Sequence, residues 1–152
     1  MEWVDALRGR IVGLDTIPLI YFIEENPGYL DTVRPFFEAL DHGQFTAITS
    51  IVTLLEVLVH PLRRGDAWLA QRYRDILLNA QGLTTFQLSQ DIAEEAARLR
   101  AVHNIRTPDA IQLATAIYRG ASFFLTNDAR LPSSSGLTML VLNELKAKPQ
   151  KN

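Results

Sequence analysis

The 152-residue chain contains no cysteine, so neither a disulfide framework nor a thiolate metal site can form. This absence is compatible with a reducing cytoplasm, where we expect the protein to act. No apolar stretch approaches the roughly 20 residues needed to cross a bilayer. Residues 1–10 also lack the continuous apolar segment of a signal peptide. We therefore expect a mature protein with no membrane partner.

The sequence also lacks a large excess of basic or acidic residues, with 15 lysines and arginines against 17 aspartates and glutamates. The formal net charge is −2, which argues against a broad, non-specific coat of nucleic acid. Local basic clusters remain, formed by Arg63, Arg64, Arg72 and Arg74 and by Arg98, Arg100 and Arg106. Such clusters are typical of solvated helix faces, yet arginines beside an acidic metal centre would also suit a phosphodiester substrate.

Several motifs of nucleotide and phosphate chemistry are absent. The chain has no G-x-G-x-x-G and no Walker A lysine motif, which argues against dinucleotide-binding and P-loop proteins. A haloacid-dehalogenase-like phosphatase needs D-x-D after its first strand, but Ile17 occupies the second acidic position. A phosphoacceptor receiver domain needs an acidic pair there and a lysine after its last strand. Here Asp15 stands alone, and Leu142 is followed by Asn143 and Glu144.

The chain instead contains alternating strand-like and helix-like segments. Its length, with 47% hydrophobic and 21% charged residues, is typical of one globular domain. Apolar or β-branched runs predict strands at 11–14, 45–49, 83–88, 123–126 and 139–142. Helical patterns and capping residues predict helices at 16–23, 30–41, 66–79, 89–103 and 107–120, and one from Ser50 that Pro61 and Gly65 end. Pro35 is expected near a helix start or at a kink. The alternation indicates an α/β fold with a mainly parallel sheet of four to five strands flanked by helices.

Four acidic residues lie where such a fold gathers its functional groups: Asp15, Glu56, Asp109 and Asp128. Ligands of parallel sheets bind beyond the carboxyl ends of the strands, and two of these acids follow strands directly. Each acid also has an ordinary explanation as a helix cap, a turn former or a solvated side chain. Glu56 is the hardest to explain in this way, because its neighbours at helical spacing are apolar. Four converging carboxylates would repel one another, and a divalent cation would resolve the conflict.

The histidines are weaker candidates for metal ligands. His60 lies four residues after Glu56 and could share its helix face, but the end of a helix before Pro61 explains it more simply. His42 and His103 likewise end predicted helices. Without cysteine, the expected cofactor is a hard cation with oxygen ligands, Mg²⁺ or Mn²⁺ before zinc.

Four short motifs, in order along the chain, resemble the PIN-domain family and, within it, the VapC-type toxins of toxin–antitoxin pairs. They are Leu14-Asp15-Thr16, Leu55-Glu56-Val57, Thr107-Pro108-Asp109-Ala110 and Thr126-Asn127-Asp128. The family often has serine after the first aspartate, and Thr16 keeps that hydroxyl. The resemblance implies one three-layer PIN-like domain over residues 1–145, followed by a polar, disordered tail at 146–152.

The resemblance also implies a function, a magnesium-dependent endoribonuclease that hydrolyses RNA as the toxin of such a pair. Asp15 and Asp109 would be the most direct metal ligands, and Glu56 and Asp128 would complete the acidic cluster. The supporting residues would be Thr16, Thr107 and Asn127, which would orient ligands or a phosphate oxygen. A cognate antitoxin and a homodimer are the implied protein partners. Two alternatives remain open: a PIN nuclease of RNA or DNA processing without an antitoxin, and a catalytically silent module that binds RNA or protein.

Overall fold

The computed structural model describes residues 2–134 and 136–146, and in these it has five strands and eight helices. The strands are β1 (Ile11–Leu14), β2 (Thr46–Ser50), β3 (Leu83–Phe86), β4 (Phe123–Thr126) and β5 (Thr138–Val141). The helices are α1 (Glu2–Asp5), α2 (Thr16–Ile23), α3 (Leu30–Asp41), α4 (Ile51–Arg64), α5 (Ala67–Asn79), α6 (Gln90–Val102), α7 (Thr107–Tyr118) and α8 (Leu142–Leu145). None of the helices in these ranges is long and apolar enough to cross a membrane.

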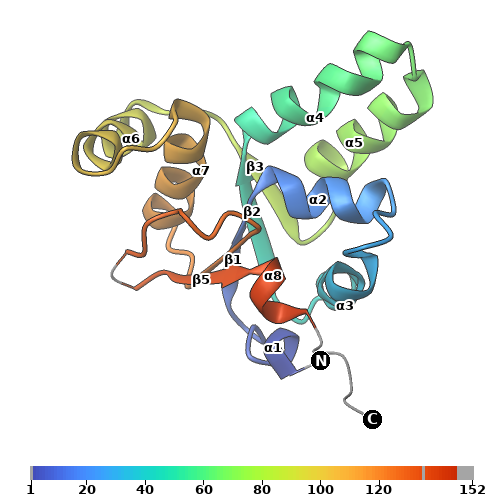
Figure 1. Cartoon of the computed structure of the whole chain (residues 1–152), viewed down its shortest axis with the longest axis horizontal. Helices are drawn as coiled ribbons and strands as arrows, with labels where there is room; N and C mark the ends of the chain where they lie inside the picture. Colours follow the sequence, from blue (N-terminus) through green and yellow to red (C-terminus); the bar gives the residue numbers. More distant parts are fainter. Residues whose placement is uncertain (1, 135, 147–152) are drawn as a thin grey trace.

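All five strands form one parallel sheet in the order β3-β2-β1-β4-β5, which confirms the predicted fold class. Figure 1 shows the sheet between two helical layers, with α6 and α7 on one side and α2, α3, α4 and α5 on the other. The chain moves outward from β1 to β2 and β3, then returns to place β4 on the other side of β1. The loops that follow β1 and β4 therefore diverge, and such a switch point leaves a crevice at the carboxyl ends of the strands.

The first strand shows how the sheet separates two cores. Val12 and Leu14 are fully buried among side chains of α2, α3 and α5. Gly13 faces the opposite layer, where a Cβ would lie 2.8 Å from the Cβ of Ala116 and 2.8 Å from Cδ2 of Phe124. Helix α7 can approach the sheet this closely only because residue 13 has no side chain.

Two prolines lie inside helices, where the sequence predicted breaks or kinks. Helix α3 begins at Leu30, as predicted, and includes Pro35 at its sixth position, so this proline lies inside the helix and not near its start. Helix α4 continues through Pro61 to Arg64 and ends at Gly65, whose φ of 69° is left-handed. An interior proline costs about 3 kcal/mol. Packing of the apolar faces of these helices on the core offsets that cost.

The ends of several elements also differ from the predictions. The sequence did not predict α1 or α8, which have four residues each. The predicted strand at 83–88 ends at Phe86, and Leu142 begins α8 instead of ending a strand. Lys146 belongs to the described chain and lies over the ring of Tyr29, with its Nζ 4.0 Å from the ring centroid. The rest of the predicted tail, 147–152, lies outside the described residues.

Candidate active site

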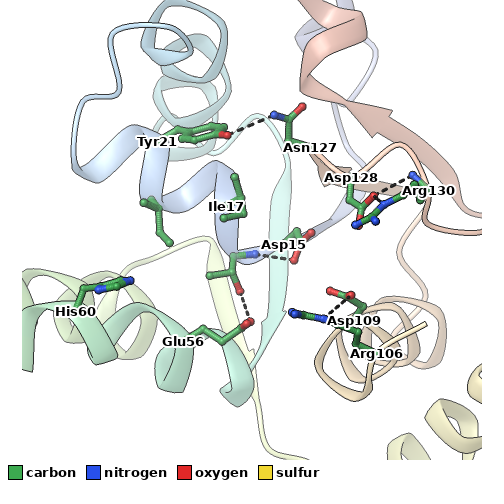
Figure 2. A pocket seen from close by; sticks show the side chains of 12 residues that line it. Asp15, Ile17, Tyr21, Glu56, His60, Arg106, Asp109, Asn127, Asp128 and Arg130 are labelled. Carbon is green, nitrogen blue, oxygen red and sulfur yellow. Dashed lines mark hydrogen bonds and ion pairs between the residues drawn. The ribbon is translucent and has the colours of Figure 1, made fainter. Parts of the chain in front are cut away.

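A cleft of about 820 Å³ lies at the carboxyl ends of β1 and β4, where the topology predicts a binding crevice. All four of the predicted acids line it. Figure 2 shows that they come from three helices and one loop: Asp15 at the start of α2, Glu56 on α4, Asp109 at the start of α7, and Asp128 after β4. The remaining lining residues are Thr16, Ile17, Ile20, Tyr21, His60, Arg106, Asn127 and Arg130.

Asp15 is the innermost of these acids and is only 9% exposed. Its Oδ1 accepts a hydrogen bond from the backbone N–H of Thr16 at 2.8 Å, so it caps α2 as the simpler interpretation expected. Its Oδ2 accepts a hydrogen bond from the hydroxyl of Thr126 at 2.7 Å. The pKa of this carboxyl is raised from its usual 3.8 to about 6, chiefly by burial and also by the charges of Asp109 and Glu56, while the two hydrogen bonds oppose the shift. The site therefore lacks positive charge at its centre.

Glu56 faces the cleft from α4 and is half-buried. Its Oε1 accepts a hydrogen bond from the hydroxyl of Thr16 at 2.8 Å. This contact explains how a carboxylate is accommodated within an apolar stretch of helix. It also joins the residue next to Asp15 directly to the second acid of the quartet (Figure 2).

Asp109 and Asp128 have arginine partners. Oδ2 of Asp109 lies 3.6 Å from Nε of Arg106. Arg130 holds Asp128 through two side-chain hydrogen bonds, Nε to Oδ1 at 3.0 Å and Nη2 to Oδ2 at 3.2 Å. The hydrogen bonds from Arg130 hold the pKa of Asp128 below its usual value, and the charge of Arg106 lowers it further. These acids thus have counter-ions, whereas Asp15 has none among residues 2–134 and 136–146.

The donor set of the cleft fits a hard divalent cation, since it offers carboxylates and hydroxyls and no thiolate. The raised pKa of Asp15 indicates where the positive charge of such an ion would be most stabilising. In residues 2–134 and 136–146, however, no three acidic or histidine side chains lie close enough to hold a metal ion together. Asp109 and Asp128 would have to turn from their arginines to bind one.

Other predicted residues occupy less central positions. Asn127 uses both ends of its amide within the protein: Nδ2 donates to the hydroxyl of Tyr21 at 3.4 Å, and Oδ1 accepts from the backbone N–H of Asn143 at 3.0 Å. Thr107 is exposed, does not line the cleft and does not cap α7, because Arg106 is the N-cap residue. His60 lines the cleft from inside α4 and does not end that helix.

The basic rim differs in part from the clusters in the sequence. Of the seven arginines in those clusters, only Arg106 lines the cleft. Arg130, which belonged to neither cluster, supplies the second lining arginine. Arg64 lies at the far end of α4, with its Nη2 3.9 Å from Oε1 of Glu24.

A family profile described as "PIN domain" matches residues 12–136, a range that includes all four acids and runs from the second residue of β1 through β4, ending before β5. The chain belongs to the PIN domain family. No curated protein sequence matches it significantly.

Solved structures share this PIN fold over most of the chain. A VapBC2 complex from Rickettsia felis, bound to a DNA fragment of its promoter, has a TM-score of 0.67 and 22% identity, covering 86% of this chain and 98% of that one. A toxin–antitoxin complex from Klebsiella pneumoniae has a TM-score of 0.62 and 25% identity, covering 86% and 96%. VapC20 of Mycobacterium tuberculosis, a toxin that cleaves the sarcin–ricin loop, has a TM-score of 0.62 and 17% identity, covering 75% and 86%.

The PIN domain also contains a buried polar cluster beneath its cleft that sequence reasoning missed. Its members are the side chains of Thr16, Thr49, Thr53 and Gln112, and each is at most 5% exposed. A separate missed residue is Thr126, the fully buried donor to Asp15. One signal could have revealed the cluster: from Ala110 to Ile117, α7 is apolar except at Gln112 and Thr115, and a polar group in so apolar a segment needs a partner.

Proposed function

We propose that this PIN domain is a divalent-metal-dependent endoribonuclease, with Mg²⁺ or Mn²⁺ as its cofactor. The observation that carries the proposal is the state of Asp15. A carboxyl group buried beside two other acids, with its pKa raised to about 6, is a costly arrangement for a protein that binds nothing there. A cation in the cleft would make the same arrangement favourable.

Within this proposal the acids divide into two roles. Asp15, Glu56 and Asp109 would hold the ion, with Thr16 fixing the rotamer of Glu56 through its hydrogen bond. Asp128 would complete the set when Arg130 releases it. A bound divalent ion supplies two things to phosphodiester hydrolysis: a water of lowered pKa and a positive charge for the phosphate oxygens.

RNA is the substrate that the cleft suits best. The cleft is wide, and Arg106 and Arg130 at its rim are the cations that a phosphodiester backbone would meet first. Each could exchange its carboxylate partner for a phosphate oxygen as the acids turn toward the ion. The structural similarity to a toxin that cleaves the sarcin–ricin loop supports RNA over DNA.

A cognate antitoxin and a second copy of the chain are the expected protein partners. Three apolar side chains on one face of α4 are exposed in the described chain: Leu55, Val59 and Leu62. Ile17, which lines the cleft, is also 41% exposed, and we expect a partner to cover exposed apolar side chains of this kind. The resemblance to toxin–antitoxin complexes supports an antitoxin on this face. We expect both proteins in the cytoplasm, where the RNA is.

Purified protein tests the activity directly. Structured RNA should be cleaved with Mg²⁺, spared with EDTA, and spared by the Asp15→Asn and Asp109→Asn variants. Arg98→Gln is the matched control, because Arg98 pairs with Glu95 on α6 and does not line the cleft. Cleavage that persists in EDTA or in the two acid variants would refute the metal-dependent mechanism.

One observation favours a second candidate, a silent module that binds RNA or protein. The arginine pairs of Asp109 and Asp128 are a stable arrangement without any metal. Titration with Mn²⁺ separates the two functions, since a silent module would bind none at millimolar concentrations. A nuclease without an antitoxin would instead bind the ion, cleave RNA, and express without arresting growth.

A further inference from the structure

A single glutamine on α7 joins that helix to α2 and α4, so that the helix capped by Asp15 and the helices that carry Glu56 and Asp109 are connected. Gln112 is 3% exposed and donates from Nε2 to the hydroxyl of Thr16 on α2 at 3.3 Å and to the hydroxyl of Thr53 on α4. It lies on α7, three residues after Asp109. We propose that Gln112 is a positioning residue that sets the spacing of the metal-binding carboxylates. The inference rests on the proposed metal-dependent function.

The hydrogen bonds of the cluster have one consistent direction. The hydroxyl of Thr16 donates to Glu56, so it can only accept from Gln112. Thr49 donates to the backbone carbonyl of Leu14 at 2.8 Å, with Oε1 of Gln112 as a longer second acceptor at 3.4 Å, so it accepts from Thr53 at 2.9 Å. Both amide hydrogens of Gln112 therefore point outward, one toward Glu56 through Thr16 and one toward the residue before Asp15 through Thr53 and Thr49.

The members of this cluster are spaced regularly from the acids. Thr53 lies three residues before Glu56 on α4, Gln112 lies three residues after Asp109 on α7, and Thr16 follows Asp15. Residues three apart share a helix face, so each bond between these side chains fixes one acid-bearing turn against another. The cluster is a buried scaffold beneath Asp15, Glu56 and Asp109.

Apolar contacts could hold the helices together equally well, but they would not fix the positions of the acid-bearing turns relative to one another. Hydrogen bonds constrain direction and distance more tightly than apolar contacts do, and a metal site tolerates errors of only about 0.5 Å. A hydroxyl that accepts a hydrogen bond is also a stronger donor, so Gln112 strengthens the hydrogen bond from Thr16 to Glu56. Outer partners of metal ligands typically change metal affinity by 10- to 100-fold.

The test replaces Gln112 with methionine, which keeps the length and flexibility of the side chain without a donor or acceptor. Thr115→Val is the matched control: Thr115 is buried one turn later on α7, and its hydroxyl bonds only its own helix at the carbonyl of Ile111. Mn²⁺ affinity is measured by electron paramagnetic resonance of the free ion. We expect Q112M to bind Mn²⁺ about tenfold more weakly than the wild type and T115V to bind it equally.

Cleavage assays add a readout that loss of stability alone would not move. Raising the metal concentration should restore the activity of Q112M toward the wild-type kcat, whereas Asp109→Asn should stay inactive. Should Q112M fail to fold, Thr53→Val removes the second hydroxyl of the scaffold while keeping its shape, and the same tenfold criterion applies.

The outcomes distinguish the two proposals. If the wild type and Q112M bind Mn²⁺ equally well, the role of Gln112 is overturned and the proposed function is left intact. Wild type that binds no Mn²⁺ overturns the proposed function, and the positioning role with it. Weakened binding in Q112M, with rescue by added metal and unchanged binding in T115V, supports the inference.

Discussion

Replacing Asp15 with asparagine should stabilise the protein when no divalent cation is present. Burial raises the pKa of this carboxyl from 3.8 to about 6, so between these values the folded state holds a proton that the unfolded state has released. The contribution of Asp15 to the free energy of unfolding is therefore fully present below about pH 4 and is lost as the pH rises through 6. The shift corresponds to a loss of about 3 kcal/mol at neutral pH.

Asparagine removes this charge but not every hydrogen bond. Its side-chain oxygen can still accept from the N–H of Thr16, whereas its amide group takes the place of the acceptor for the hydroxyl of Thr126. The loss of that acceptor costs about 1 kcal/mol. The net gain is then about 2 kcal/mol near neutral pH, which corresponds to a rise in Tm of about 4–8 °C for a chain of this length.

Thermal unfolding in EDTA between pH 4 and pH 8 measures the effect. The Tm advantage of Asp15→Asn should be present at the upper end and vanish at the lower end, while Asp5→Asn, at an exposed position in α1, should follow the wild type throughout. Added Mg²⁺ should reverse the order, since an ion at 100 times its Kd stabilises the wild type by about 2.7 kcal/mol. An asparagine variant less stable than the wild type at pH 8 in EDTA would refute the reasoning.

Three further predictions concern packing, the arginine pairs and pH. Gly13→Ala places a Cβ 2.8 Å from Ala116 and Phe124 and should lower the free energy of unfolding by about 1–3 kcal/mol in urea denaturation, and an unchanged midpoint would contradict the close approach of α7. Arg130→Gln frees Asp128 and should tighten Mn²⁺ binding by up to about fivefold. In fluorescence anisotropy it should weaken RNA binding and the dependence of that binding on salt. Stronger RNA binding would count against a contact between Arg130 and the phosphate backbone. Mn²⁺ affinity should fall roughly tenfold from pH 7 to pH 5, because the ion must displace the proton of Asp15, and a flat profile would exclude Asp15 as a ligand.

The sequence predicted what local patterns determine. The run Ile11–Leu14 is apolar and short, and a residue that follows such a strand and precedes Thr16 and Pro18 is a natural helix cap. Asp15 is such a cap in the structure. The same local logic placed Asp128 after β4 and Asp109 in the first turn of α7.

Convergence of the acids could not be predicted, because it depends on the order of the strands. Asp15 and Asp128 lie at one crevice only since β4 pairs with β1 and not with the edge strand β3. That choice is made by long-range packing, including the close contact of α7 over Gly13. The buried scaffold was missed for the same reason, since Thr49 and Gln112 are 63 residues apart in sequence.

The structure divides the four acids by how their charge is balanced in the absence of metal. Asp109 and Asp128 hold arginines. Glu56 holds a hydroxyl, and Asp15, the most deeply buried, is balanced by a proton over part of the physiological range. A cation that entered the cleft would displace that proton. It would also draw Asp109 away from Arg106 and Asp128 away from Arg130. The same event that assembles the metal site would therefore release two cations at its rim, where a phosphodiester backbone would bind. Binding of the metal should therefore increase the affinity for RNA, and binding of RNA should increase the affinity for the metal. The hydrogen bonds of Gln112 would keep the helices fixed while only the side chains of Asp109 and Asp128 turn.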